Sequence, residues 1–259
     1  MVMATDTAIH SSISGVVLVL LVDLLKAKRS WGWLRLAQGS AALKQIAGLV
    51  FAKVMGSGHE GGFVLRPSPS HQGLVLVFER QSQADDFLNS DLCQQYKKNA
   101  REWFSATMRV DSSRGSWNQI AWQATTSSAL GSSNHDLDKM PIATITRASI
   151  RSATAMAFWR HAPATQADLQ SAPGCLLAMG LGEAPLLRQC TFSIWKNTAS
   201  MVAYAQSGAH HAAIQAAYKH GFFTESMFVR MRVLSMAGAW QGQDFTAKNP
   251  SLAEEVVHA

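Results

Sequence analysis

The chain has 259 residues, of which 47% are hydrophobic and 15% are charged. This composition excludes intrinsic disorder and allows a substantial hydrophobic core. The formal net charge of +6 comes from scattered Lys and Arg residues and not from a basic run with interleaved aromatic residues, which argues against nucleic-acid binding. The three cysteines lack the spacing of metal ligands and are typical of a reducing cytoplasm.

The first apolar segment, residues 15–22, is too short to cross a bilayer as a helix. No Lys or Arg precedes it, Asp6 does, and Asp23 ends it without a cleavage site of small residues, unlike a signal peptide. We therefore predict a buried strand and a cytoplasmic protein. The moderate positive charge leaves open a peripheral contact with anionic membrane lipid or with an acidic redox partner.

Two parts of the chain show the same predicted order: strand, helix, strand, strand, helix, strand. In the first part the predicted elements span residues 13–22, 30–45, 48–55, 73–79, 82–102 and 106–114. In the second they span residues 141–150, 152–160, 174–181, 189–196, 198–220 and 227–236. Side-by-side matches, such as Trp33 with Trp159, support an internal repeat of domain length.

This order is the split βαβ, ferredoxin-like motif, an antiparallel sheet with both helices on one face. Two tandem copies can cover their remaining faces by packing sheet against sheet. We therefore predict an α+β fold in which two βαββαβ halves, residues 13–117 and 141–241, form one barrel-like unit. A Ser-, Thr- and Asn-rich linker without periodicity joins them at residues 118–140.

The halves differ most in the helix predicted at residues 198–220, where a break near Ser207 is expected in the second half alone. His210 follows the break, whereas the first half has Cys93 at the matching position. Packing alone would be satisfied by the same residue twice, so this asymmetry indicates a functional site. A histidine on an apolar face can equally be a core residue. On a helix, the neighbours of His210 are Ala213, Ile214 and Ala217.

Common catalytic motifs do not account for the sequence. Residues 56–61 fit the pattern GxGxxG, but an extended segment follows where a dinucleotide site needs a helix. Neither GxSxG nor HExxH occurs. The abundance of Met and Trp suits an apolar interior that could hold a hydrophobic ligand or a porphyrin.

Characteristic motifs stand at residues 143–151, 158–160, 172–195, 204–214 and 222–228, together with 31–37, 53–58 and 112–117. These segments resemble the spheroidene monooxygenase family, the carotenoid ketolases of phototrophic bacteria and their relatives. The resemblance extends over about residues 13 to 241. It implies a haem b protein of the tandem ferredoxin-like, dimeric α/β-barrel type. It also implies O2-dependent oxidation of an acyclic carotenoid at an allylic carbon, with electrons from a ferredoxin-type donor.

In similar haem barrels a histidine on the late helix holds the iron, and by this resemblance that histidine maps to His210. Ala213, Ile214 and Ala217 would then contact the haem. Residues on the opposite haem face should come from the facing sheet. By position and polarity we select Ser193 as a haem contact and three residues as catalytic candidates, although each could instead be a surface or packing residue: Arg147, Arg188 and Trp195.

Two alternatives to an oxygenase stay open. An aldoxime dehydratase- or peroxidase-like haem enzyme would need an acid–base group beside the reacting atom. The nearest histidines, His211 and His220, share the helix of His210 and cannot easily reach the opposite haem face. An oxygenase needs such a group less, because bound oxygen performs the difficult chemistry. The second alternative is a non-catalytic haem- or lipid-binding protein that kept the fold.

Overall fold

The computed structural model describes residues 11–125, 140–184 and 186–246. The first half of the chain forms β2 (Val16–Leu24), α1 (Arg29–Gln38), β3 (Leu49–Gly58), β4 (Pro67–Phe78), α2 (Gln81–Asn89), α3 (Asp91–Asn99) and β5 (Ala100–Gly115). The second half forms β7 (Ile142–Ile150), α5 (Ala155–Trp159), α6 (Ala162–Ser171), β8 (Cys175–Ala184), β9 (Arg188–Trp195), α7 (Thr198–Ala205), α8 (Gly208–His220) and β10 (Phe223–Trp240). Shorter elements are β1 (Ser11–Ile13), β6 (Ile120–Trp122), β11 (Gln243–Asp244) and the 3-10 turns η1 (Lys26–Lys28), η2 (Gly39–Leu43), η3 (His59–Gly61) and η5 (Ser152–Thr154).

The order of strands and helices predicted for both halves is confirmed, but two helices differ from the prediction. The segment 82–102 is not one helix: Ser90 ends α2 and caps α3, since its hydroxyl accepts the backbone N–H of Cys93. The expectation that only the second half has a broken helix was therefore wrong. The additional helix α6 was not predicted, because its residues lack a clear apolar stripe.

Hydrogen bonding joins the main strands in the order β11-β10-β5-β2-β4-β3-β8-β9-β7, with a further pairing of β10 with β7. The strand at one end of this order, β7, is therefore also paired with β10, which lies next to the other end. The register is antiparallel between β2 and β4, between β7 and β9, between β8 and β9, and between β7 and β10. The protein is a mixed α/β fold built on antiparallel strand pairs.

The first apolar segment forms β2, as predicted, and all nine of its residues are buried. A strand buried on both faces reads as a continuous apolar run without alternation, which explains the sequence VVLVLL. Within the described ranges, none of the helices combines the length and the apolar character needed to cross a membrane.

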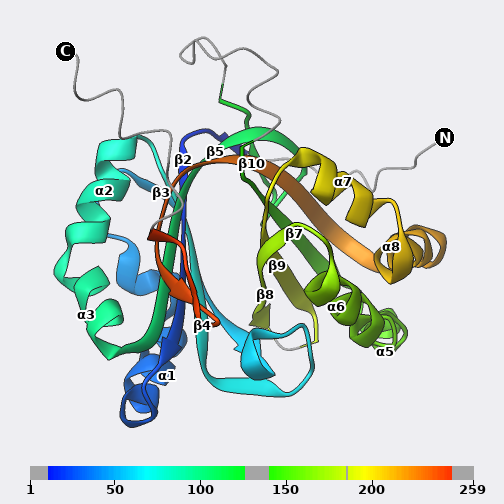
Figure 1. Cartoon of the computed structure of the whole chain (residues 1–259), viewed down its shortest axis with the longest axis horizontal. Helices are drawn as coiled ribbons and strands as arrows, with labels where there is room; N and C mark the ends of the chain where they lie inside the picture. Colours follow the sequence, from blue (N-terminus) through cyan, green and yellow to red (C-terminus); the bar gives the residue numbers. More distant parts are fainter. Residues whose placement is uncertain (1–10, 126–139, 185, 247–259) are drawn as a thin grey trace. The chain divides into compact units, whose positions relative to one another are not determined.

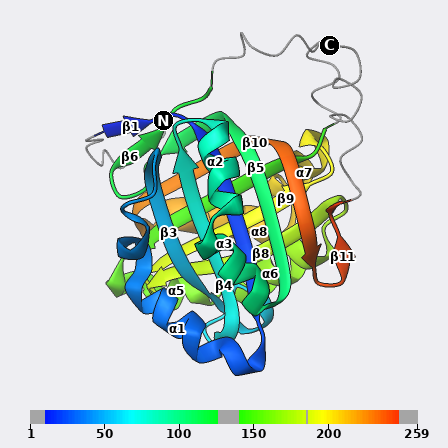
Figure 2. The ribbon, with the colours of Figure 1, turned by 90° about the vertical axis from the view of Figure 1, so that its left-hand side faces the viewer.

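One compact unit comprises Gly15–Val54, Ser70–Met108 and the described residues from Val233 onward. In this unit α2 and α3 lie along one face of the strands (Figure 2). Phe87 of α2 and Tyr96 of α3 pack onto apolar side chains of β2 and β4. The strand residues of this core include Leu18, Leu20, Val22, Leu74, Leu76 and Phe78.

The other compact unit comprises the described residues up to Ser14, Met55–Pro69 and Arg109–Arg232. Here α5 to α8 cover one face of β7, β8 and β9 (Figure 1). Met201 of α7 and Trp195 belong to one apolar cluster, against which Leu169 of α6 packs. The end of β3, the η3 loop and the end of β5 thus belong to the unit that contains most of the second half.

The predicted linker, residues 118–140, is not without structure. Its beginning forms β6, which pairs in parallel with β1. A three-residue strand such as this gives too short a pattern to be read from the sequence. Most of the predicted linker, residues 126–139, lies outside the described residues.

Candidate functional site

His210 lies on the first turn of α8, and two residues determine where that helix begins. Gly208 has a φ of +63°, in the left-handed region that favours glycine. The carboxylate of Asp168, on α6, accepts a hydrogen bond from the backbone N–H of Ala209. A Cβ at Gly208 would lie 2.4 Å from Oδ2 of Asp168. The glycine and the carboxylate therefore hold the N-terminus of α8 against α6, and His210 with it.

We expect Gly208→Ala to destabilise the protein more than Gly221→Ala, a matched control at the other end of α8. Both glycines have positive φ, but a Cβ at Gly221 would have no atom of the described residues within 4 Å. The control therefore measures the cost of backbone strain alone. The additional loss of stability in Gly208→Ala measures the lost capping contact with Asp168, and we expect it to be roughly 1 kcal/mol. Denaturant unfolding of the two variants provides the comparison. Equal losses of stability would contradict the capping role of Asp168.

The ring of His210 stacks on Tyr204 of α7, with 4.7 Å between ring centroids and an interplanar angle of 23°. Tyr204 in turn packs against Trp195 of β9, at a centroid distance of 5.1 Å. Burial lowers the pKa of His210; nearby Asp168 opposes this and neighbouring His211 adds to it. Burial therefore favours the neutral imidazole of His210, the form in which it can bind a metal.

Ala213, Ile214 and Ala217, the helix neighbours expected for His210, share its side of α8. His210, Ala213 and Ile214 are half-buried and Ala217 is buried. His211 is exposed, and its ring nitrogen lies 2.9 Å from the side-chain amide nitrogen of Gln215. Only the first histidine of the pair therefore faces the interior of this unit.

Tyr204 and Trp195 connect His210 to one face of the sheet. Thr144 of β7 lies opposite Ser193 of β9 in the strand register, and their hydroxyl groups are 2.8 Å apart. Ser193 also accepts a hydrogen bond of 3.0 Å from the indole N–H of Trp195. Since directly opposed residues of antiparallel strands share a face, these side chains form one polar cluster on the helix-covered side.

Arg230 of β10 also belongs to this face, because it lies opposite Thr144 in the register. Arg230 is half-buried, and its Nε atom is buried without a hydrogen-bond partner among the described residues. A buried donor without a partner is costly and rare in proteins. Thr146, two residues further along β7, is exposed although most of its neighbours on that strand are buried. Among the described residues, this face therefore presents a buried Nε donor without a partner and an exposed threonine.

Small residues of β8 continue the same face. Ala178 lies opposite Ser193, and Gly180 lies opposite Thr191. A Cβ at Gly180 would lie 2.7 Å from the carbonyl oxygen of Gly62, so the backbone of the loop after η3 lies directly on it. The next residue of this loop, Phe63, stacks on Trp159 at a centroid distance of 5.0 Å. A loop from the first half of the chain thus borders the site.

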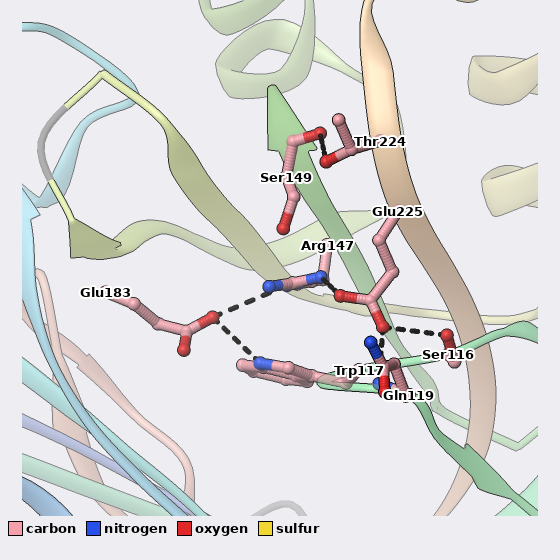
Figure 3. A network of polar contacts seen from close by, with 8 residues as sticks. All are labelled: Ser116, Trp117, Gln119, Arg147, Ser149, Glu183, Thr224 and Glu225. Carbon is pink, nitrogen blue, oxygen red and sulfur yellow. Dashed lines mark hydrogen bonds and ion pairs between the residues drawn. The ribbon is translucent and has the colours of Figure 1, made fainter. Parts of the chain in front are cut away.

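Arg147 lies on the other face of β7, away from Thr144 and Thr146. Its side chain is 1% exposed and forms ion pairs with Glu225 and, at 3.4 Å, with Glu183 (Figure 3). The guanidinium carbon lies 5.8 Å from the centroid of the Trp117 ring. The structure therefore does not bring Arg147 together with His210.

Glu225 is held as an anion within the network of Figure 3. Burial by itself would raise its pKa. The backbone N–H of Gln119, the hydroxyl of Ser116 and the guanidinium of Arg147 together lower the pKa below its ordinary value. The arrangement satisfies a buried charge with hydrogen bonds and an opposite charge, which is typical of a structural ion pair.

The remaining residues selected from the sequence also lie on different faces of the sheet. Arg188 is the exposed first residue of β9 and lies opposite Ser149, on the side of Arg147. Trp195 and Ser193 lie on the side of His210. Sequence reasoning missed Arg230 and Thr146, because a single strand does not show which of its alternating faces meets a given helix. Alternation in β10 would have grouped Arg230 with Phe228, but without placing either beside α8.

Solved structures show which fold class this arrangement belongs to. An aldoxime dehydratase structure is similar with a TM-score of 0.54 at 10% identity, covering 84% of this chain and 81% of that chain. A structure of an aldoxime dehydratase in complex with butyraldoxime gives a TM-score of 0.53 at 11% identity, covering 84% and 79%. The chain therefore has the fold of these enzymes. No protein-family model matches it.

Sequence relatives give the family. The chain is 44% identical over 244 residues to the spheroidene monooxygenase of Rubrivivax gelatinosus, covering 93% of this chain and 91% of the relative. It is 31% identical over 196 residues to the spheroidene monooxygenase of Rhodobacter capsulatus, covering 75% and 79%. The chain belongs to the spheroidene monooxygenase family, a family of oxidoreductases, which confirms the resemblance seen in the sequence.

Proposed function

We propose that this protein is a haem-dependent monooxygenase that oxidises an acyclic carotenoid at an allylic carbon. The observation that carries the proposal is the half-buried imidazole of His210, which Tyr204 and Trp195 link to a sheet face of small and polar residues. This face includes the buried Nε of Arg230, which has no partner among the described residues. Membership of a family whose relatives are named spheroidene monooxygenase supports the substrate class.

The residues around His210 fit a haem. The imidazole is half-buried, and burial favours its neutral form, in which it could hold the iron of a haem. Ala213, Ile214 and Ala217 give the same helix face a small, apolar surface. The buried Nε of Arg230 has no partner among the described residues and would gain one from a bound polar group. Haem b bound through His210 would supply the iron at which dioxygen is activated.

The chain's own residues would then orient the imidazole of His210 and polarise groups bound in the site. Tyr204 stacks on the imidazole, and its hydroxyl donates to the carbonyl oxygen of Thr165 at 3.4 Å, which limits rotation of both rings. Arg230 and Thr146 would donate hydrogen bonds into the site from the sheet. In the overall reaction one oxygen atom enters a C–H bond of the polyene and the other leaves as water. A ferredoxin-type protein would provide the two electrons, and solvent the two protons.

The position of His210 has a counterpart that supports a functional role. His210 is the third residue of α8 and Cys93 the third residue of α3, as expected if the two halves are tandem ferredoxin-like copies. Cys93 is buried in the core of its unit together with Tyr96. The equivalent place in the second half carries a larger, half-buried, titratable ring. Packing explains the cysteine and leaves the histidine to be explained by ligand binding.

The function is tested by expressing the protein in air with an acyclic carotenoid pathway and analysing the products. We expect keto or hydroxy derivatives of the carotenoid. Absence of oxidised carotenoid, combined with rapid dehydration of an aldoxime by the ferrous protein, would replace the proposal with the dehydratase alternative. Haem binding without any substrate-dependent oxygen consumption would instead indicate the non-catalytic carrier.

Arg230→Ala should lower turnover about a hundredfold while leaving haem content unchanged, because a donor aimed at developing charge contributes roughly that much. Arg188→Ala is the matched control: it removes the same side chain from the other side of the sheet and should keep wild-type turnover. Product formation per bound haem is the quantity to compare. The reverse pattern, with Arg188 required and Arg230 dispensable, would restore the assignment made from the sequence.

A further inference from the structure

The segment formed by η1 and α1 exposes large apolar side chains beside basic ones. Trp33 is 48% exposed and Leu34 is 55% exposed, and Leu25 just before η1 is also exposed. Lys26 and Lys28 of the same segment are exposed as well. We call these five residues the α1 surface. Single exposed apolar residues are ordinary, but a tryptophan and two leucines grouped in one segment mark a contact surface.

Packing on the inner side of α1 prevents Trp33 and Leu34 from turning inward. A Cβ at Gly32 would lie 2.0 Å from Cδ1 of Leu24, so the helix rests directly on β2 at this glycine. Trp31 points into the core, with its ring centroid 4.8 Å from that of Tyr96. The rotation of α1 is thereby determined, and its outward face presents Trp33 and Leu34.

The charge around this surface is of one sign. Between Leu24 and His59 the sequence has no Asp or Glu. The acidic residue that precedes η1, Asp23, is buried and forms an ion pair with Arg101. The basic residues in this stretch are Lys26, Lys28, Arg29, Arg35, Lys44 and Lys53. The α1 surface is therefore positively charged through its two exposed lysines, and its stretch of sequence contains no carboxylate.

We propose that the α1 surface docks the protein onto an anionic lipid bilayer. Trp33 and Leu34 enter the boundary between headgroups and acyl chains, where Trp is favoured. Lys26 and Lys28 lie at the level of the lipid phosphates. An acidic protein would complement the lysines but not the adjoining apolar side chains, so the bilayer fits the whole surface better. The inference deepens the proposed function, since an acyclic carotenoid resides in membranes, but its test does not depend on turnover.

The test is sedimentation of the full-length protein with vesicles of phosphatidylcholine, either alone or mixed with phosphatidylglycerol. We expect binding to the mixed vesicles, weakened by salt, and little binding to phosphatidylcholine alone. Lys26→Gln/Lys28→Gln should weaken binding about fivefold for each charge removed. Trp33→Ser/Leu34→Ser should weaken it at least as strongly, because the buried apolar area is lost.

Matched controls remove similar groups elsewhere. Met156→Ser removes an apolar side chain that is 66% exposed on α5, and Lys196→Gln/Lys219→Gln removes two exposed charges. Both controls should bind vesicles like the wild type, and thermal unfolding should show all variants folded. Wild-type protein that does not bind mixed vesicles would overturn the proposal. It would be overturned equally if the α1 variants kept full binding, or if the controls lost as much binding as the α1 variants. Lysine-dependent binding to an acidic ferredoxin-type protein, without vesicle binding, would assign the surface to that partner instead.

Discussion

Replacing His210 with alanine is expected to abolish the Soret absorption of the haem-reconstituted protein. The imidazole is the one protein group that we assign to the iron, whereas the hydroxyl of the stacked Tyr204 is directed at the carbonyl oxygen of Thr165. Haem retained by apolar contacts alone should give a weak, shifted band. Added imidazole should restore that band, because the substitution leaves a cavity of the size of the lost ring. Titration of the purified protein with haemin, followed by absorption, measures the effect.

His211→Ala is the control for this prediction, since it removes the same side chain one residue further along α8. His211 is exposed and interacts with Gln215, so the variant should bind haem like the wild type. If His211→Ala abolished the Soret band and His210→Ala kept it, the assignment of the two histidines would be reversed. If both variants kept the band, the ligand would lie elsewhere in the chain.

Arg147→Ala is expected to lower the free energy of unfolding by about 3–5 kcal/mol, the usual cost of removing one partner from a buried ion pair. The substitution would leave Glu225 and Glu183 as carboxylates without their shared cation. Arg232→Ala is the control, because its ion pair with Asp111 is less buried, and a smaller loss of stability is expected. Denaturant unfolding gives both values.

The same network predicts a dependence on pH. The pKa of Glu225 is lower in the folded protein than its ordinary value. Its stabilising contribution is therefore complete above the ordinary pKa and is lost as the pH falls through the lowered one. Glu225→Gln should accordingly flatten the acid side of the stability profile.

An Arg147→Ala variant with normal stability but without turnover would contradict the structural role of Arg147 and favour the catalytic role predicted from the sequence.

The elements that the sequence predicted well are those with a strong local pattern. The apolar run of β2 and the alternation of β9 have the periodicity of strands. The N-terminus of α8 was predictable because Ser207 and Gly208 are poor helix formers. The two sides of that helix followed from spacing alone, since His210 shares its side with Ala213 and Ala217.

What the sequence could not show depends on contacts between distant segments. Thr146 and Arg147 are neighbours on β7, and which of them faces α8 is decided by the register with β9 and β10. Arg230 enters the site only through that register. The contact of Gly62 with Gly180 joins segments far apart in the sequence. The break at Ser90 was missed because serine is common both within and between helices.

The central claim is that the protein inserts an atom of dioxygen into a polyene with the help of haem held by His210. The most direct test is turnover of an acyclic carotenoid by the purified, haem-loaded protein under heavy-isotope dioxygen, with a ferredoxin-type reductant. We predict that the product carries the heavy isotope and that His210→Ala forms none. Product oxygen derived from water, or labelled product formed equally by the haem-free protein, would contradict the claim.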